Sequence, residues 1–99
     1  MTVFYIRMEI EIGNIYKNIN CESFLDEETN RIRVRPCVNQ IVSSDLVIEC
    51  SKAIRESHPI GTIFICEEVK VCKKQTGRIY LRAKNQMIYI KIKKNYLKF

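Results

Sequence analysis

The chain has 99 residues, of which 46% are hydrophobic and 28% are charged, and its formal net charge is +6. This length and composition predict a single domain spanning residues 1–99 and exclude two separate hydrophobic cores. No window holds the roughly 18 apolar residues of a membrane-spanning helix, and Arg7, Glu9 and Glu11 interrupt the apolar positions that a signal peptide would need. We therefore expect a soluble, cytoplasmic protein.

The N-terminal residues predict a hairpin. Residues 4–12 alternate strictly between apolar and polar side chains, which is typical of a half-buried strand. A turn at Gly13 and Asn14 would fold a second alternating segment, residues 15–19, back on the first.

A third strand is expected at residues 31–35. It follows residues 26–30, whose composition is that of a solvent-exposed loop, and it places Ile32 and Val34 inward. Pro36 ends it, because proline has no backbone N–H to donate.

Residues 44–57 predict one amphipathic helix. A serine and Asp45 at its start can accept hydrogen bonds from unpaired backbone N–H groups. Apolar residues then recur at helical spacing, at Leu46, Val47, Cys50, Ala53 and Ile54. Pro59 stops the helix, because its ring disfavours the helical conformation at His58.

The last third predicts a meander of three antiparallel strands with hairpin loops at residues 73–77 and 85–86. The shorter loop would place Ala83 opposite Ile88 and Leu81 opposite Ile90, so that every inward pair is apolar. The longer loop would place Val71 opposite Ile79 and Val69 opposite Leu81. Glu67 would then point inward, and a bulge near Glu67 and Glu68 is the simplest repair.

Together these elements predict an α+β fold: five to six mostly antiparallel strands in a curved sheet or small barrel, with one amphipathic helix at about residues 44–57. Short strands with one intervening helix suit an oligonucleotide-binding or SH3-like barrel, although such an analogy does not establish function.

The five cysteines indicate reduced thiols. Their number is odd and no C-x-x-C pair occurs, which argues against a complete disulfide framework. His58 is the only histidine, so neither a zinc site nor another cofactor is expected. A Cys50–His58 pair across the helix end is the nearest approach to catalytic chemistry, and a helix-terminal role for His58 is the stronger interpretation. We expect no enzymatic activity.

Charge is distributed unevenly along the chain. Glu68 is the last acidic residue, and the 31 residues that follow it contain ten Lys or Arg, whereas residues 1–68 contain seven bases and eleven acids. A basic surface attracts phosphates or acidic proteins before any specific contact forms. Anionic lipid is not favoured, because basic membrane anchors are commonly amphipathic helices.

The outer face of the meander interleaves cations with aromatic rings, and this composition suits nucleic acid, since cations neutralise phosphates and tyrosine rings stack on unpaired bases. The candidate contacts are Lys70, Arg78, Tyr80, Arg82, Lys84, Tyr89, Lys91 and Lys93. Arg31, Arg33 and Arg35 form a second basic row, which could extend this face or pair with Glu9 and Glu11.

Two other interpretations stay open. The basic face could simply be a solvated sheet surface, where tyrosine favours strands and lysine protects edges. It could also meet an acidic surface of another protein or of a second copy. The leading hypothesis is a small non-enzymatic protein that engages nucleic acid non-specifically, and the alternative is a protein-interaction module that forms a homodimer.

Overall fold

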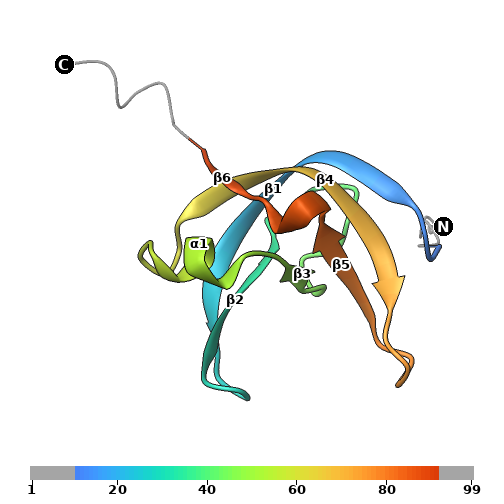
Figure 1. The fold of residues 1–99 in the computed structure, drawn as a ribbon, viewed down its shortest axis with the longest axis horizontal. Helices are drawn as coiled ribbons and strands as arrows, with labels where there is room; N and C mark the ends of the chain where they lie inside the picture. The colour runs from blue at the N-terminus through green and yellow to red at the C-terminus, as the bar shows by residue number, and fades with distance from the viewer. Residues whose placement is uncertain (1–10, 92–99) are drawn as a thin grey trace, which may run out of the picture.

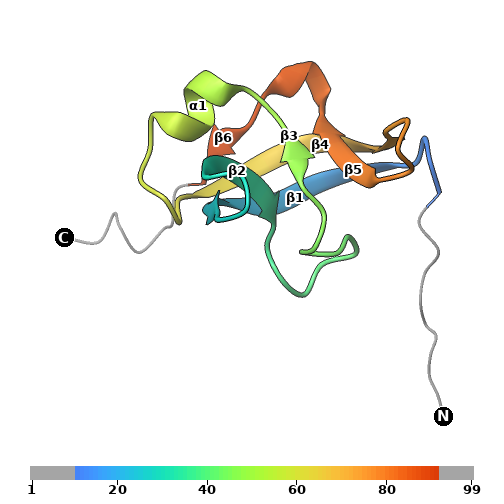
Figure 2. The same cartoon turned by 90° about the horizontal axis from the view of Figure 1, so that it is seen from below.

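The computed structural model describes residues 11–91 (Figures 1 and 2). The strands are β1 (Ile15–Asp26), β2 (Arg31–Pro36), β3 (Ile48–Glu49), β4 (Ile63–Lys73), β5 (Ile79–Ala83) and β6 (Tyr89–Ile90). One short helix, α1 (Lys52–Glu56), lies between β3 and β4, and a 3₁₀ turn, η1 (Lys84–Gln86), joins β5 to β6.

Five strands form a nearly closed, barrel-like mixed sheet in the order β2-β1-β4-β5-β3, and β6 pairs with the end of β4 that β5 leaves free. Among the strand pairs of residues 11–91, only β3–β5 is parallel. The predicted fold class, with mostly antiparallel strands in a small barrel, is confirmed. The fold is mostly β, because its helix is short.

The barrel interior holds the hydrophobic core. Inward side chains of β2, β4 and β5 are fully buried, among them Val34, Phe64 and Leu81. Burying a side chain of this size contributes about 1.5–3 kcal/mol each. The inward positions predicted for Ile32 and Val34 are confirmed, with Val34 fully buried and Ile32 half-buried.

Most of the first predicted strand lies outside the described residues. Glu11 accepts a hydrogen bond from the N–H of Asn14 at 3.1 Å, and Gly13 has a φ of 95°, so the predicted turn is present. The strand predicted at residues 15–19 is the start of the longer β1. It pairs with β4 along this stretch and with β2 farther on.

The predicted helix at residues 44–57 is wrong at its N-terminal end. Ile48 and Glu49 form β3 instead and pair with Leu81 and Arg82. A buried Ile48 on a strand next to Leu81 stabilises the barrel more than one further helical turn at the surface would. The helix begins after Ser51, whose Oγ accepts a hydrogen bond from the N–H of Ile54 at 3.2 Å, and its end agrees with the prediction.

The β4–β5 hairpin is present, but its register differs by two residues from the predicted one. Val71 lies opposite Leu81 and Val69 opposite Ala83. Glu67 therefore lies beyond the end of β5, and it is exposed rather than inward as the predicted register would place it. The alternation of β4 still breaks at Glu67 and Glu68, since Cys66 and Val69 on either side of them are both buried.

The predicted pairs Ala83–Ile88 and Leu81–Ile90 are wrong, and residue 92, the end of the predicted strand, lies outside the described residues. β3 occupies the edge of β5 that this hairpin would have used, so the chain turns at Asn85 and Gln86 and crosses to β4. Tyr89 consequently lies opposite Ile65, and Ile88 is buried.

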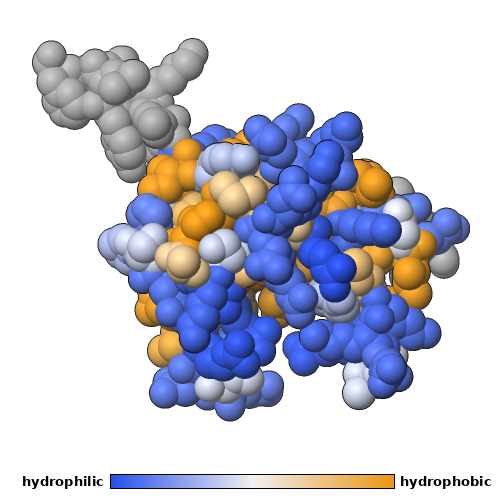
Figure 3. Space-filling model, in the orientation of Figure 1, coloured by the Kyte–Doolittle hydropathy of each residue, from blue (hydrophilic) through white to orange (hydrophobic). Residues whose placement is uncertain are grey.

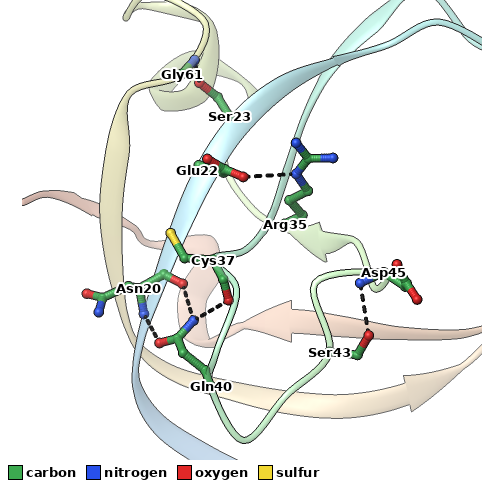
Figure 4. A network of polar contacts seen from close by, with 9 residues as sticks. All are labelled: Asn20, Glu22, Ser23, Arg35, Cys37, Gln40, Ser43, Asp45 and Gly61. Carbon is green, nitrogen blue, oxygen red and sulfur yellow. Dashed lines mark hydrogen bonds and ion pairs between the residues drawn. The ribbon is translucent and has the colours of Figure 1, made fainter.

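Polar contacts fix the connections around β1 (Figure 4). The Gln40 side chain accepts from the N–H of Asn20 at 2.8 Å and donates to its carbonyl at 2.7 Å, which imitates a strand partner. The buried Ser23 accepts the N–H of Gly61 at both its carbonyl and its hydroxyl oxygen, and this anchors the segment that leads from α1 into β4.

Candidate nucleic-acid interface

Within the described residues, the barrel is open between β2 and β3, which are the two ends of the strand order, and we call this opening the seam. Arg55 of α1 spans it. Its Nε donates to the carbonyl of Ile32 on β2, and its Nη1 donates to the carbonyl of Cys50 next to β3, both at 2.8 Å. A side chain of the helix thus supplies hydrogen bonds that a β2–β3 ladder would otherwise supply.

An open pocket of about 330 Å³ lies at this seam, and we call it the seam pocket. Its polar lining consists of Arg31, Arg33, Glu49, Lys52, Arg55 and Gln86. Val47, Ile48 and Cys50 supply the apolar part. Four cations and one carboxylate therefore surround the opening.

The charges in the seam pocket are only partly neutralised. Arg33 lies 3.1 Å from Asp26, and Glu49 pairs with Lys74 of the β4–β5 hairpin at 3.0 Å. Arg31 and Lys52 are exposed and have no ion pair within residues 11–91. These two cations are available to an anion.

Of the predicted outward row Arg31, Arg33 and Arg35, only Arg31 is exposed, and the other two are half-buried. Arg35 is paired with Glu22 at 3.1 Å and lies over the ring of Phe24, so it belongs to the β1–β2 hairpin rather than to the pocket. Arg31 and Arg33 do line the pocket and so extend the basic surface.

Three of the predicted contacts come together. Lys70 lies opposite Arg82, and both line a shallow depression with Lys84 and Glu68. We call Lys70, Arg82 and Lys84 the C-terminal cations.

Tyr80 does not offer the free ring that the sequence predicted. It is only 9% exposed, its hydroxyl accepts a hydrogen bond from Arg82 at 3.1 Å, and the ammonium of Lys74 lies 4.7 Å from its ring centroid. The hairpin loop folds Lys74 over the ring, which prediction from alternation alone could not reveal.

The other predicted contacts are dispersed. Arg78 is exposed in the β4–β5 loop. Tyr89 is 43% exposed on β6, and Lys91 donates to Asn20 at 3.0 Å at the far end of β4. Lys93 lies outside the described residues.

The seam pocket and the C-terminal cations adjoin one another. The β3–β5 pairing places Glu49 beside Arg82, and η1 borders both, through Gln86 at the pocket and Lys84 at the cations. Figure 3 shows hydrophilic residues across the centre of this face and on the two hairpins below it. Sequence reasoning missed Lys52, Arg55 and Gln86, because their placement depends on the strand order.

Comparison with known proteins is negative. No family model, curated protein or solved structure matches the chain. Within residues 11–91, no helix is long and apolar enough to cross a membrane, and no group of three or more His, Cys, Asp or Glu side chains could hold a metal ion.

The buried cysteines Cys21, Cys50 and Cys66 belong to the hydrophobic core. All five cysteines are free, and burial raises the pKa of the Cys50 thiol above its usual value. The ring of His58 packs edge-on against Phe64 with centroids 5.6 Å apart, and its Nδ1 lies 3.1 Å from the carbonyl of Ile54. These surroundings give His58 a structural role at the helix end.

Proposed function

We propose that this protein is a small, non-enzymatic module that binds nucleic acid non-specifically across the seam pocket and the adjoining C-terminal cations. The observation that carries the proposal is the convergence of exposed cations from distant segments on one surface. Arg31 and Lys52 border the seam pocket, and Arg82 and Lys84 lie next to it on β5 and η1.

A surface with several exposed Lys and Arg side chains is suited to binding phosphate groups. Lys and Arg side chains that neutralise phosphates release condensed counterions, so binding gains free energy without reading sequence. Guanidinium groups also bind phosphate oxygens in pairs. The two neighbouring carboxylates, Glu49 and Glu68, are paired with Lys74 and Lys17 and repel phosphate less than free carboxylates would.

The strand order lends independent support. A five-stranded, partly open barrel with a parallel β3–β5 pair and a helix between β3 and β4 has the arrangement of an oligonucleotide-binding barrel. Such barrels bind ligands on the face of their second and third strands and between the loops joining strands one to two and four to five. The seam pocket lies on that face. The analogy concerns the fold, and the cations carry the functional step.

Two charge-matched double variants test the surface. Arg31→Glu with Arg82→Glu should weaken binding of a fluorescein-labelled 15-nucleotide single strand about a hundredfold at 50 mM salt, because two charge-assisted contacts become repulsive. Fluorescence anisotropy measures the affinity.

Lys73→Glu with Lys91→Glu is the control, since it changes net charge equally and neither residue lines the seam pocket or the depression that holds the C-terminal cations. It should weaken binding less than about fivefold, as expected for a long-range charge effect. Equal losses in both double variants would refute the assignment of the surface.

Self-association is a second candidate function. Met87, Tyr89 and Ile90 lie close together in sequence at and before β6, and they are 37–44% exposed. Exposed apolar side chains of this kind favour contact with a partner such as a second copy. Light scattering of the intact chain distinguishes a dimer from a monomer.

A further inference from the structure

The turn between β5 and β6 has an unusual backbone. Asn85 and Gln86 follow one another with φ angles of 54° and 59°, in the left-handed region that glycine adopts without cost. Asparagine tolerates this conformation well, but a long side chain such as glutamine is disfavoured there. Non-glycine residues in this region often lie at functional sites.

The surroundings of Gln86 hold it in this conformation. Its carbonyl accepts the N–H of Ser51 at 2.8 Å, and Met87 N–H donates to the carbonyl of Lys84 at 3.1 Å. These backbone bonds need no particular side chain at position 86, so a glycine would serve the turn equally well. Gln86 is exposed and lines the seam pocket.

The pocket combines the two kinds of group that a nucleotide needs. Arg31 and Lys52 supply cations for phosphate, and the Gln86 amide supplies one acceptor and two donors. Phosphate contacts position a strand, whereas hydrogen bonds to base edges specify sequence. A volume of about 330 Å³ is at the lower end of small-molecule sites and suits one nucleotide rather than a duplex.

We propose that the seam pocket takes one unpaired nucleotide of a bound single strand and that the Gln86 amide hydrogen-bonds the edge of its base. This inference rests on the proposed function and narrows its substrate to single-stranded nucleic acid. Unpaired bases expose their Watson–Crick edges, whereas base pairing occupies those edges in a duplex. Gln86 thereby adds a base preference at one position to an otherwise sequence-independent contact.

The variant Gln86→Gly tests this inference, with Asn85→Gly as a matched control. Each variant removes one side chain from the same turn and places glycine at a position with a positive φ, which glycine adopts without strain. Both variants should therefore unfold at the same temperature as the wild type or at a higher one. Asn85 does not line the seam pocket.

The probes are homopolymeric 12-nucleotide DNA strands of each of the four bases, together with a mixed-sequence duplex. The wild type should prefer one base by at least about fivefold, the lower end of a bidentate base contact, and should bind the duplex more weakly. Gln86→Gly should abolish the preference, and Asn85→Gly should keep it. A wild type without preference, or an unchanged preference in Gln86→Gly, would overturn the inference while leaving the proposed function intact. Failure of the wild type to bind any strand would overturn both.

Discussion

Replacing Arg55 by methionine is expected to lower the free energy of unfolding by about 2–4 kcal/mol. The substitution removes two charge-assisted hydrogen bonds to backbone carbonyls, each contributing roughly 1.5–3 kcal/mol. Arg55 is only half-buried, so water replaces part of this loss. Those carbonyls, of Ile32 and Cys50, lie on opposite sides of the seam. Methionine keeps most of the apolar length of the arginine side chain. The decrease in the free energy of unfolding therefore reports the lost hydrogen bonds across the seam rather than lost packing.

Urea unfolding of two further variants isolates this effect. Arg55→Lys keeps the charge but has a single terminal nitrogen, so it should recover only part of the loss. Lys52→Met removes an exposed cation from the same helix and should change the free energy of unfolding by less than about 0.5 kcal/mol. An Arg55→Met variant as stable as Lys52→Met would contradict the bridging role.

Raising the pH above 9 is expected to destabilise the fold steeply. Burial raises the pKa of Cys21 far above its usual value, raises that of Cys66 to about 11, and raises that of Cys50. A raised native pKa means that the thiol stays protonated in the fold while it ionises in the unfolded chain. The resulting stability is fully present below pH 9 and is lost as the pH rises toward the native pKa. Once the thiol is fully ionised in the unfolded chain, it contributes a slope of about −1.4 kcal/mol per pH unit to the free energy of unfolding.

The change in the free energy of unfolding between pH 9 and 10, compared between the wild type and Cys66→Ala, tests this expectation. Urea unfolding of Cys66→Ala should give a lower stability than wild type at pH 8, because a buried side chain is truncated. Its further loss between pH 9 and 10 should be smaller than that of wild type by about 1 kcal/mol, because one titrating thiol is absent and a thiol of the unfolded chain is only partly ionised at pH 9. Identical slopes would show that Cys66 does not ionise differently in the folded and unfolded chains.

Local sequence signals predicted the strands better than their partners. Alternation placed Ile32 and Val34 inward and marked β4 and β5, because side-chain direction along a strand is a local property. The parallel pairing of Ile48 with Leu81 joins segments distant in sequence, and no local pattern signals it. That one pairing explains both the short helix and the lost hairpin after β5.

The residues of the candidate site were likewise predictable from the sequence only in part. The cations after Glu68 are visible in the sequence, and Lys70 and Arg82 do lie together on neighbouring strands. The roles of Arg55 and Gln86 follow from a seam that exists only once β2 and β3 are placed at the ends of the sheet. The burial of Tyr80 depends on a loop lysine, so exposure could not be inferred from strand alternation.

Salt-dependent binding of a single strand by the unmodified protein tests the central claim most directly. A labelled mixed-sequence 15-nucleotide strand is titrated at 50 and 200 mM salt, and light scattering records the mass of the protein. Four phosphate contacts predict that the affinity falls roughly fiftyfold between these salt concentrations. An absence of binding at 50 mM salt, or an affinity that salt leaves unchanged, would contradict nucleic-acid binding through these cations.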